Sequence, residues 1–292
     1  MRDARLLVLV KLTVRLTSTA NERAHGFLRD IGLQLVVVEV HRAPVGVVQV
    51  WDRVGSAYET DGITGVSHAL EHMMFKTTRN LELGEFSRIV SARGGRENAF
   101  TSSDYTAYFQ QWAAENVGLS FELEAERMHN LVIDDEEFKK EINVVLEERR
   151  LRTDDNPQAL ASEAARAAAF PTSPYRYPVI GWEADIKSMT GSDLRTWYER
   201  WYAPDNATLV VVGDVEPAAI KALAEKHFGP IKPERIAPPR LRPEVPQHGT
   251  KSLVMKSEKA RVPQLYMAYK APVLNDALAD ESDIPEWEIY AR

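Results

Sequence analysis

The 292-residue sequence contains no cysteine, no long apolar run and no excess of basic side chains. The lack of cysteine excludes a disulfide scaffold, thiolate metal sites and cysteine nucleophiles. No apolar run approaches the roughly 20 residues that a membrane helix needs, so we expect no membrane span. With 36 basic and 43 acidic side chains the formal net charge is −7, whereas nucleic-acid binders usually carry a basic patch. We therefore expect no nucleic-acid partner, and any metal must be held by His, Asp or Glu.

The remaining composition is that of a globular protein with one large or two ordinary domains. Hydrophobic residues make up 44% of the chain, and a domain typically contains roughly 100–200 residues. At the N-terminus, Arg2 and Arg5 precede an apolar stretch at 6–10, which resembles a degenerate signal peptide. Lys11 and Arg15 interrupt that stretch, so a short strand or a disordered leader is an equal alternative. A signal peptide predicts a periplasmic protein, and its absence would favour the cytoplasm.

The pattern of apolar residues predicts an α+β fold, with a mixed or antiparallel sheet packed against helices. Two β-runs, at 33–40 and 45–54, flank a short turn and are interpreted as a hairpin. Residues 98–109 alternate as a third strand, and 207–212 form a fourth. The predicted helices cover residues 62–77, 84–93, 116–130, 136–152, 159–169, 193–201 and 217–228.

Proline marks the clearest boundary in the sequence. Six prolines fall within residues 230–246, and such a composition favours a stiff linker. Beyond it, residues 252–255 and 264–269 are predicted strands that echo the first hairpin, and 280–292 are predicted to start a helix. The chain is accordingly divided into a leader, one complete α+β domain, a linker and the start of an incomplete second domain, at residues 1–24, 25–229, 230–250 and 251–292.

His68, Glu71 and His72 lie within the helix predicted at 62–77, in the order H-x-x-E-H. At roughly 100° per residue the three side chains project from one face. Both imidazoles can then bind one ion, while the carboxylate reaches a water molecule beside it. This order is the inverzincin arrangement, and chance would produce it on the order of 0.01–0.02 times in such a chain. The alternative is a pair of exposed helix histidines that bind no metal.

A zinc site of this kind needs a third protein ligand and leaves one position for water. The helix predicted at 136–152 carries several acids, and helical phase separates them. Glu148 and Glu141 border the apolar stripe, whereas Glu147 faces water. Glu148 is therefore the predicted third ligand, with Glu141 beside it; the alternative of a solvated surface acid suits Glu147 better. Arg149 lies on the apolar face and is expected to pair with a buried acid that the sequence does not identify.

These residues resemble the pitrilysin/insulinase family of zinc metallopeptidases, in particular the bacterial branch related to the mitochondrial processing peptidase. The family's third ligand, a Glu within Glu-x-x-x-x-x-x-Glu, falls on Glu148, with Glu141 at the first position of the pair. Three further stretches carry the resemblance, at residues 65–67, 98–108 and 201–207. The resemblance extends over residues 33–273 and implies a pitrilysin/processing-peptidase-like domain.

The resemblance implies a zinc-dependent endopeptidase that hydrolyses extended peptides or small unfolded proteins. One Zn²⁺ per chain would be held by His68, His72 and Glu148, with Glu71 as the general base and Glu141 supporting the ligands. The rival interpretation is a non-catalytic structural or partner subunit of the same fold. Such subunits typically lose a ligand or the base, and this chain keeps all four. A metal-dependent hydrolase of another kind of bond is a third alternative.

The segment at 98–109 has no clearly apolar face, which is typical of an edge strand rather than a core strand. A free edge can pair with an extended peptide by β-augmentation. In the family this strand holds the substrate, so Asn98, Ala99 and Phe100 are the predicted substrate-binding residues. The alternative is an ordinary edge strand that polar side chains protect.

The family's two similar halves close over the peptide, and this chain carries only the start of the second. We therefore expect a homo-oligomer, or a heterodimer with a chain that supplies the second half. The 292-residue chain alone is expected to bind zinc but to cleave peptides poorly.

Overall fold

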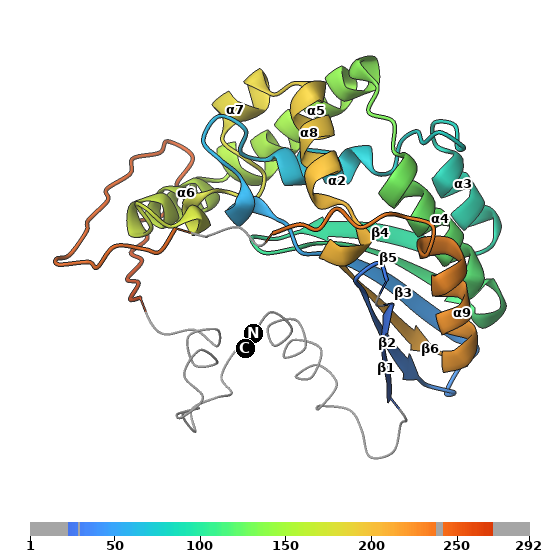
Figure 1. Cartoon of the computed structure of the whole chain (residues 1–292). Helices are drawn as coiled ribbons and strands as arrows, with labels where there is room; N and C mark the ends of the chain where they lie inside the picture. The colour runs from blue at the N-terminus through green and yellow to red at the C-terminus, as the bar shows by residue number, and fades with distance from the viewer. Residues whose placement is uncertain (1–22, 29, 238–241, 271–292) are drawn as a thin grey trace, which may run out of the picture. The chain divides into compact units, whose positions relative to one another are not determined.

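A six-stranded sheet runs through the part of the chain that the structure, a computed structural model, describes: residues 23–28, 30–237 and 242–270 (Figure 1). Its strands are β1 (Arg23–Leu28), β2 (Leu33–Glu39), β3 (Val45–Asp52), β4 (Arg96–Thr101), β5 (Thr106–Ala113) and β6 (Ala207–Gly213). Their spatial order is β1-β2-β6-β3-β5-β4. The pair β2 and β6 is parallel and every other neighbouring pair is antiparallel. The sheet is therefore mixed, and with its helices the fold is α+β.

The predicted hairpin between β2 and β3 is wrong in its pairing. Both strands form, but β6 lies between them, since Val210 is opposite Val36 on one side and opposite Gln49 on the other. The centre of β6 is apolar, with Leu209 and Val211 fully buried. A short turn shows that two strands follow each other along the chain, but a distant apolar strand can still insert between them.

The single strand predicted at 98–109 is also wrong, because the segment forms two strands, β4 and β5. They are joined by a turn in which the Ser102 N–H donates to the Tyr105 carbonyl at 2.8 Å. Ser and Asp at 102–104 favour such a turn through side-chain bonds to the local backbone. In the described part of the chain, β4 is an edge strand of the sheet, as is β1 at the other side.

Helices cover one face of the sheet (Figure 1). They are α2 (Val66–Met73), α3 (Glu85–Ala92), α4 (Val117–Asn130), α5 (Asp135–Arg149), α6 (Pro157–Ala169), α7 (Glu183–Ser188), α8 (Gly191–Trp201) and α9 (Pro217–Phe228). Short turns of 3₁₀-helix are η1 (Ser56–Tyr58), η2 (Ala114–Asn116), η4 (Pro174–Arg176) and η5 (Pro204–Asn206), and η3 (Arg150–Asp154) is a π-turn. None of the described helices is long and apolar enough to cross a membrane.

Two apolar clusters fill this layer. The first lies between the sheet and α3, α4 and α9, and includes Leu35, Val50, Phe121, Leu209 and Phe228. The second surrounds α2 and α8, and includes Leu70, Met73, Leu194, Trp197 and Trp201. Because the second cluster holds α2 against α8, it fixes the helix that carries the H-x-x-E-H sequence.

The strands predicted at 252–255 and 264–269 are wrong, since the described residues from 242 onward contain no strand. Their apolar side chains are exposed, with Val254 at 83% and Leu265 at 85%. β-propensity does not make a stable strand unless other strands pair with it. The chain divides into two units, Asn21–Ala260 and a second made of Met1–Ala20 with Arg261–Arg292. Most of the predicted leader and the helix start predicted at 280–292 lie outside the described residues.

Candidate metal centre

The helix α2 is held at its first turn by a buried carboxylate. Glu59, only 4% exposed, accepts hydrogen bonds from the N–H groups of Gly65 (2.7 Å) and Ser67 (2.9 Å). The first N–H groups of a helix have no partner within it, and no side chain caps α2 locally. Burial raises the pKa of Glu59 to about 7, against the opposing effect of these two bonds. Gly65 has φ +88°, and a Cβ there would lie 2.5 Å from the Ile180 carbonyl oxygen, so only glycine fits.

His68 and His72 point from α2 toward Glu148 on α5. The Nε2 atoms lie 3.6 Å (His68) and 3.3 Å (His72) from Glu148 Oε2. One ligand atom from each of the three residues lies within 4.8 Å of the other two. The structure thus brings together the three residues that the sequence predicts as metal ligands. Two imidazole nitrogens and one carboxylate oxygen form a donor set that Zn²⁺ takes in catalytic sites.

The protonation states of His68 and Glu148 suit a divalent metal. Burial, reinforced by the neighbouring His72, lowers the pKa of His68 to about 4, so its imidazole is neutral near pH 7. Its Nδ1 is buried and has no hydrogen-bond partner among the described residues. The hydrogen bond with His72 lowers the pKa of Glu148. A neutral imidazole and an ionised carboxylate are the forms that bind a metal, so His68 and Glu148 fit the ion.

His72 makes contacts through both of its ring nitrogens. Its Nδ1 lies 2.8 Å from Glu141 Oε1, while Nε2 faces Glu148. Burial lowers the pKa of His72, but the hydrogen bonds to Glu148 and Glu141 raise it above its ordinary value. Glu141 also contacts Lys76, whose Nζ lies 2.6 Å from Oε2. Carboxylates in this position orient a ligating histidine and fix its tautomer.

Glu71 lies on the same helix, on the side toward β4. Thr101 Oγ1, on β4, donates a short hydrogen bond to Glu71 Oε2. Burial raises the pKa of Glu71, although the bond from Thr101 opposes the shift. A carboxylate with a raised pKa is a stronger proton acceptor. The predicted general base is thus a partly buried group with one oxygen held by the strand.

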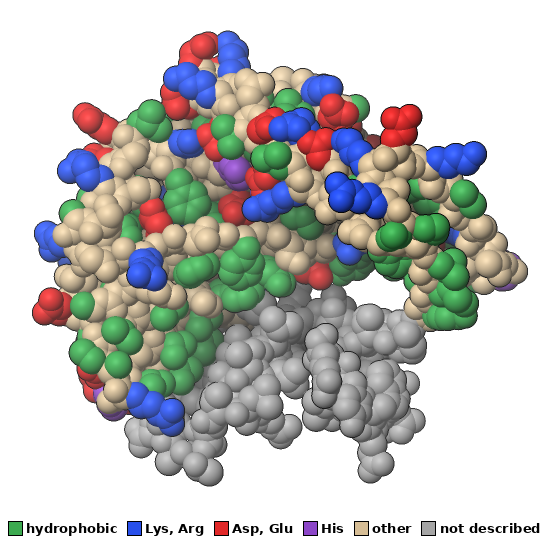
Figure 2. Space-filling view, turned by 180° about the vertical axis from the view of Figure 1, so that it is seen from behind, with side chains coloured by type: hydrophobic (Ala, Val, Ile, Leu, Met, Phe, Trp, Pro, Cys, Tyr) green, Lys and Arg blue, Asp and Glu red, His purple; other side chains and the backbone are tan. Residues whose placement is uncertain are grey.

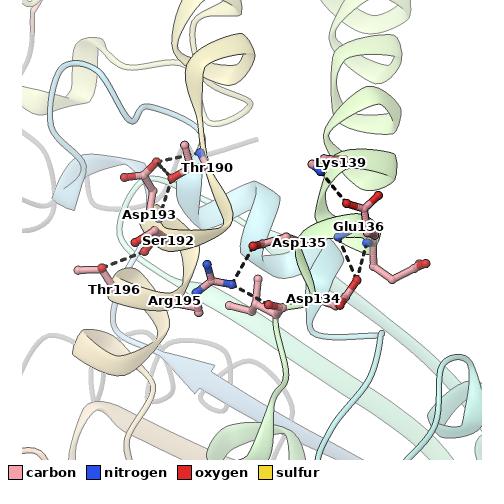
Figure 3. Close-up of polar contacts among 11 residues, drawn as sticks. Asp134, Asp135, Glu136, Lys139, Thr190, Ser192, Asp193, Arg195 and Thr196 are labelled. Carbon is pink, nitrogen blue, oxygen red and sulfur yellow. Dashed lines mark hydrogen bonds and ion pairs between the residues drawn. The ribbon is translucent and has the colours of Figure 1, made fainter.

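The start of α5 is fixed by polar contacts that Figure 3 shows. Asp134 accepts hydrogen bonds from two N–H groups of the first turn, both at 3.0 Å. Arg195 reaches across from α8, where its Nη1 donates to the Ile133 carbonyl (2.8 Å) and to Asp135 (2.9 Å). These contacts tie the start of the helix that carries Glu141 and Glu148.

At the other end of α5 the helical phase predicted from the sequence is confirmed. The side chain of Glu148 is 16% exposed and faces the histidines, whereas that of Glu147 is 55% exposed and pairs with Arg150. Arg149 is 4% exposed and donates two hydrogen bonds to Glu163 on α6, at 2.8 and 2.9 Å. Glu163, which is partly buried, is therefore the partner of Arg149 that the sequence did not identify.

The predicted substrate-binding residues Asn98, Ala99 and Phe100 lie on the edge strand β4. In an antiparallel ladder, hydrogen-bonded and non-hydrogen-bonded pairs alternate. Ser102 and Tyr105 are a hydrogen-bonded pair, so by this alternation Ala99 belongs to a non-hydrogen-bonded pair. Its N–H and C=O therefore point away from β5. Its N–H bonds instead to the side chain of Asn98, at 2.9 Å. Phe100 is 37% exposed.

Sequence reasoning missed four residues around the site: Glu59, Lys76, Thr101 and Arg152. Lys76 lies four residues after His72, so helical spacing was a usable signal. Thr101 shares a face of β4 with Ala99 because alternate residues point the same way. Arg152 Nη1 lies 2.5 Å from Glu148 Oε1 at i,i+4 spacing. Glu59 had no local signal, since only the folded chain brings it to α2.

Basic and acidic side chains are interspersed over the upper part of the face in Figure 2, and hydrophobic side chains gather lower down. Among the described residues on that face there is no continuous basic patch of the kind that binds nucleic acid.

The insulinase (peptidase family M16) domain model matches residues 35–182, which contain the three predicted metal ligands, the predicted base and the other predicted site residues. The chain belongs to peptidase family M16. A second model, the peptidase M16 inactive domain, matches residues 188–283. The family resemblance predicted from the sequence is thereby confirmed.

Several M16 proteins resemble this one over about half of their own length. Zinc protease PqqE of Helicobacter pylori is 38% identical over 244 residues, which cover 82% of this chain and 55% of the relative. The crystal structure of a protease from Helicobacter pylori has a TM-score of 0.73 at 38% identity, over 77% of this chain and 55% of that one. The first half of the periplasmic protease PqqL from Escherichia coli has a TM-score of 0.71 over 79% and 51% of the two chains. Its identity is 24%, so that likeness concerns the fold.

Proposed function

We propose that this M16 chain carries the metal-binding half of a zinc-dependent endopeptidase. The observation that carries the proposal is the convergence of His68, His72 and Glu148, with Glu71 beside them. Support comes from the family and from a relative named as a zinc protease. We expect one Zn²⁺ per chain. A non-catalytic subunit is disfavoured because it would not need a base and three ligands together.

Each site residue has one task in this reaction. The bound zinc would supply Lewis acidity toward a peptide carbonyl and a water molecule. Glu71 accepts a proton on a carboxylate oxygen as water attacks the scissile carbonyl, and then delivers that proton to the leaving amine. Thr101 holds the other oxygen, so the carboxylate keeps one orientation. Glu141 orients His72 through Nδ1.

The edge of β4 suits an extended peptide. The outward N–H and C=O of Ala99 can pair with a peptide backbone by β-augmentation, which requires the side chain of Asn98 to release the N–H. Thr101, two residues along the same strand, contacts Glu71. A peptide on this edge would therefore lie next to the general base. A folded protein offers no free strand, which favours peptides or small unfolded proteins as substrates.

We further propose that a second half completes the catalytic unit. The chain spans about half the length of the relatives it matches, and an edge strand by itself leaves a bound peptide open to water. A second half could come from a further copy of the chain or from a partner subunit. The predicted compartment is still the periplasm, with the cytoplasm as the alternative.

The function is tested by Glu71→Gln, assayed with a quenched fluorescent peptide library in the presence of the second half. Turnover should fall by roughly 10²–10⁴, the usual size of a general-base contribution, while zinc content stays at the wild-type level. Glu147→Gln, an exposed glutamate on α5, is the matched control and should keep full turnover. An unchanged rate in Glu71→Gln would contradict the assignment, and a wild type without cleavage would favour the non-catalytic subunit.

A further inference from the structure

Two glutamates on α5 reach the candidate metal centre, and only one is in position to be a ligand. The side chains of Glu141 and Glu148 are similarly buried, at 13% and 16% exposed. Both contact His72, Glu141 at Nδ1 (2.8 Å) and Glu148 at Nε2 (3.3 Å). By chemistry alone either carboxylate could ligate zinc. Their tasks are separated by the ring nitrogen of His72 that each glutamate contacts and by the groups that engage its oxygens.

The difference lies in which carboxylate oxygens are already engaged. Glu141 uses Oε1 for His72 and Oε2 for Lys76, whose Nζ lies at 2.6 Å. Glu148 uses Oε1 for Arg152, while Oε2 faces the Nε2 atoms of both histidines. Both oxygens of Glu141 are therefore engaged on the Nδ1 side of His72, whereas Glu148 Oε2 faces the Nε2 atoms of both histidines.

Lys76 is well placed to hold Glu141 in this state. It lies three residues after the last residue of α2, in the turn that follows the helix, where its N–H donates to the Met73 carbonyl at 3.0 Å. Its side chain is 26% exposed. A partly buried, close ion pair is less screened by salt than a pair on the open surface. Arg152, by contrast, is 74% exposed.

We propose that Lys76 is a positioning residue that keeps Glu141 as the hydrogen-bond partner of His72 and out of the ligand set, leaving Glu148 as the third ligand. This inference rests on the proposed function, because it requires a metal at His68, His72 and Glu148. Without the lysine, Glu141 becomes an unpaired carboxylate next to a cation site. It then turns toward the ion as a competing ligand and stops orienting His72.

The test measures metal binding rather than activity. Zinc affinity is determined by competition with a chromophoric chelator, and coordination is followed by the visible spectrum of the Co²⁺-substituted chain. Lys76→Met should weaken zinc binding about 10–100-fold, as loss of an outer partner typically does, and should shift the cobalt spectrum. Lys76→Arg keeps the charge and should restore most of the affinity. Lys139→Met, which removes an exposed ion pair with Glu136 on α5 (Figure 3), should change neither.

A double variant distinguishes the proposed role of Lys76, which is to keep Glu141 out of the ligand set, from a merely structural role. In Lys76→Met/Glu141→Gln the second change neutralises the competing carboxylate, so the cobalt spectrum should return toward that of the wild type. Lys76→Gln provides the same charge removal should Lys76→Met fold poorly. Wild-type affinity and spectrum in Lys76→Met, or an equal loss in Lys139→Met, would overturn the role of Lys76. A wild type that binds neither ion would overturn the metal site and this role together.

Discussion

The two helices that carry the proposed metal ligands, α2 and α5, are fixed in different ways. Six of the eight residues of α2 are buried, and its first turn is held by Glu59, which is itself buried. Only three of the fifteen residues of α5 are buried. Its start is tied by the pair of Arg195 and Asp135, whose side chains are 42% and 62% exposed. The histidines therefore lie on a mostly buried helix, whereas Glu148 lies on a mostly exposed helix whose start is tied by surface contacts.

This contrast indicates where the site is vulnerable. A substitution beneath α2 should lower both the stability of the fold and the affinity for metal, because Glu59 and the histidines belong to the same mostly buried helix and its anchor. A change at the start of α5 should affect neither strongly, because exposed ion pairs contribute little.

The largest effect is expected when the anchor of α2 is removed. Glu59→Ala leaves the buried N–H groups of Gly65 and Ser67 without an acceptor, at a cost of about 1–3 kcal/mol for each group. We expect the free energy of unfolding in urea to fall by about 3 kcal/mol or more, and zinc to bind more weakly. Glu122→Ala, an exposed glutamate on α4, is the control and should change neither. A loss no larger than that of the control would show that Glu59 does not anchor α2.

A smaller effect is expected from the titration of Glu59. Burial raises its pKa from 4.5 to about 7, so the folded state binds this proton more tightly than the unfolded state does. This tighter proton binding contributes to the free energy of unfolding. The contribution is fully present below about pH 4.5 and is lost as pH rises toward 7. Relative to Glu59→Gln, which does not titrate, the wild type should lose up to about 3 kcal/mol of unfolding free energy over that range. Urea denaturation at several pH values measures it, and parallel curves would contradict the assignment.

The smallest effect is expected at the start of α5. Arg195→Met removes the exposed ion pair with Asp135 but keeps the apolar stem, so the unfolding free energy should fall by less than about 1 kcal/mol. Zinc affinity should stay within about twofold of the wild type. A large loss of zinc would show that α5 is positioned from its start, and the contrast between the two helices would not hold.

The same contrast explains what the sequence could predict. The spacing of His68, Glu71 and His72 and the phase of Glu148 are local properties of a helix, and both were predicted correctly. The strand order was not, because β6 joins the sheet from far along the chain. The role of Glu59 and the pairing of Arg149 with Glu163 also depend on contacts between distant segments. The local periodicity of the sequence predicts which face of a helix or strand a residue occupies. Which residues of other elements pack against that face depends on the tertiary fold.

The central claim is that His68, His72 and Glu148 hold one zinc ion. The direct test is the zinc content, by mass spectrometry, of the wild type, Glu148→Gln and Glu147→Gln after equilibration with zinc and removal of the excess. We predict about one zinc per chain in the wild type and in Glu147→Gln, and almost none in Glu148→Gln. Equal zinc content in the two variants, or a wild type without zinc, would contradict the claim.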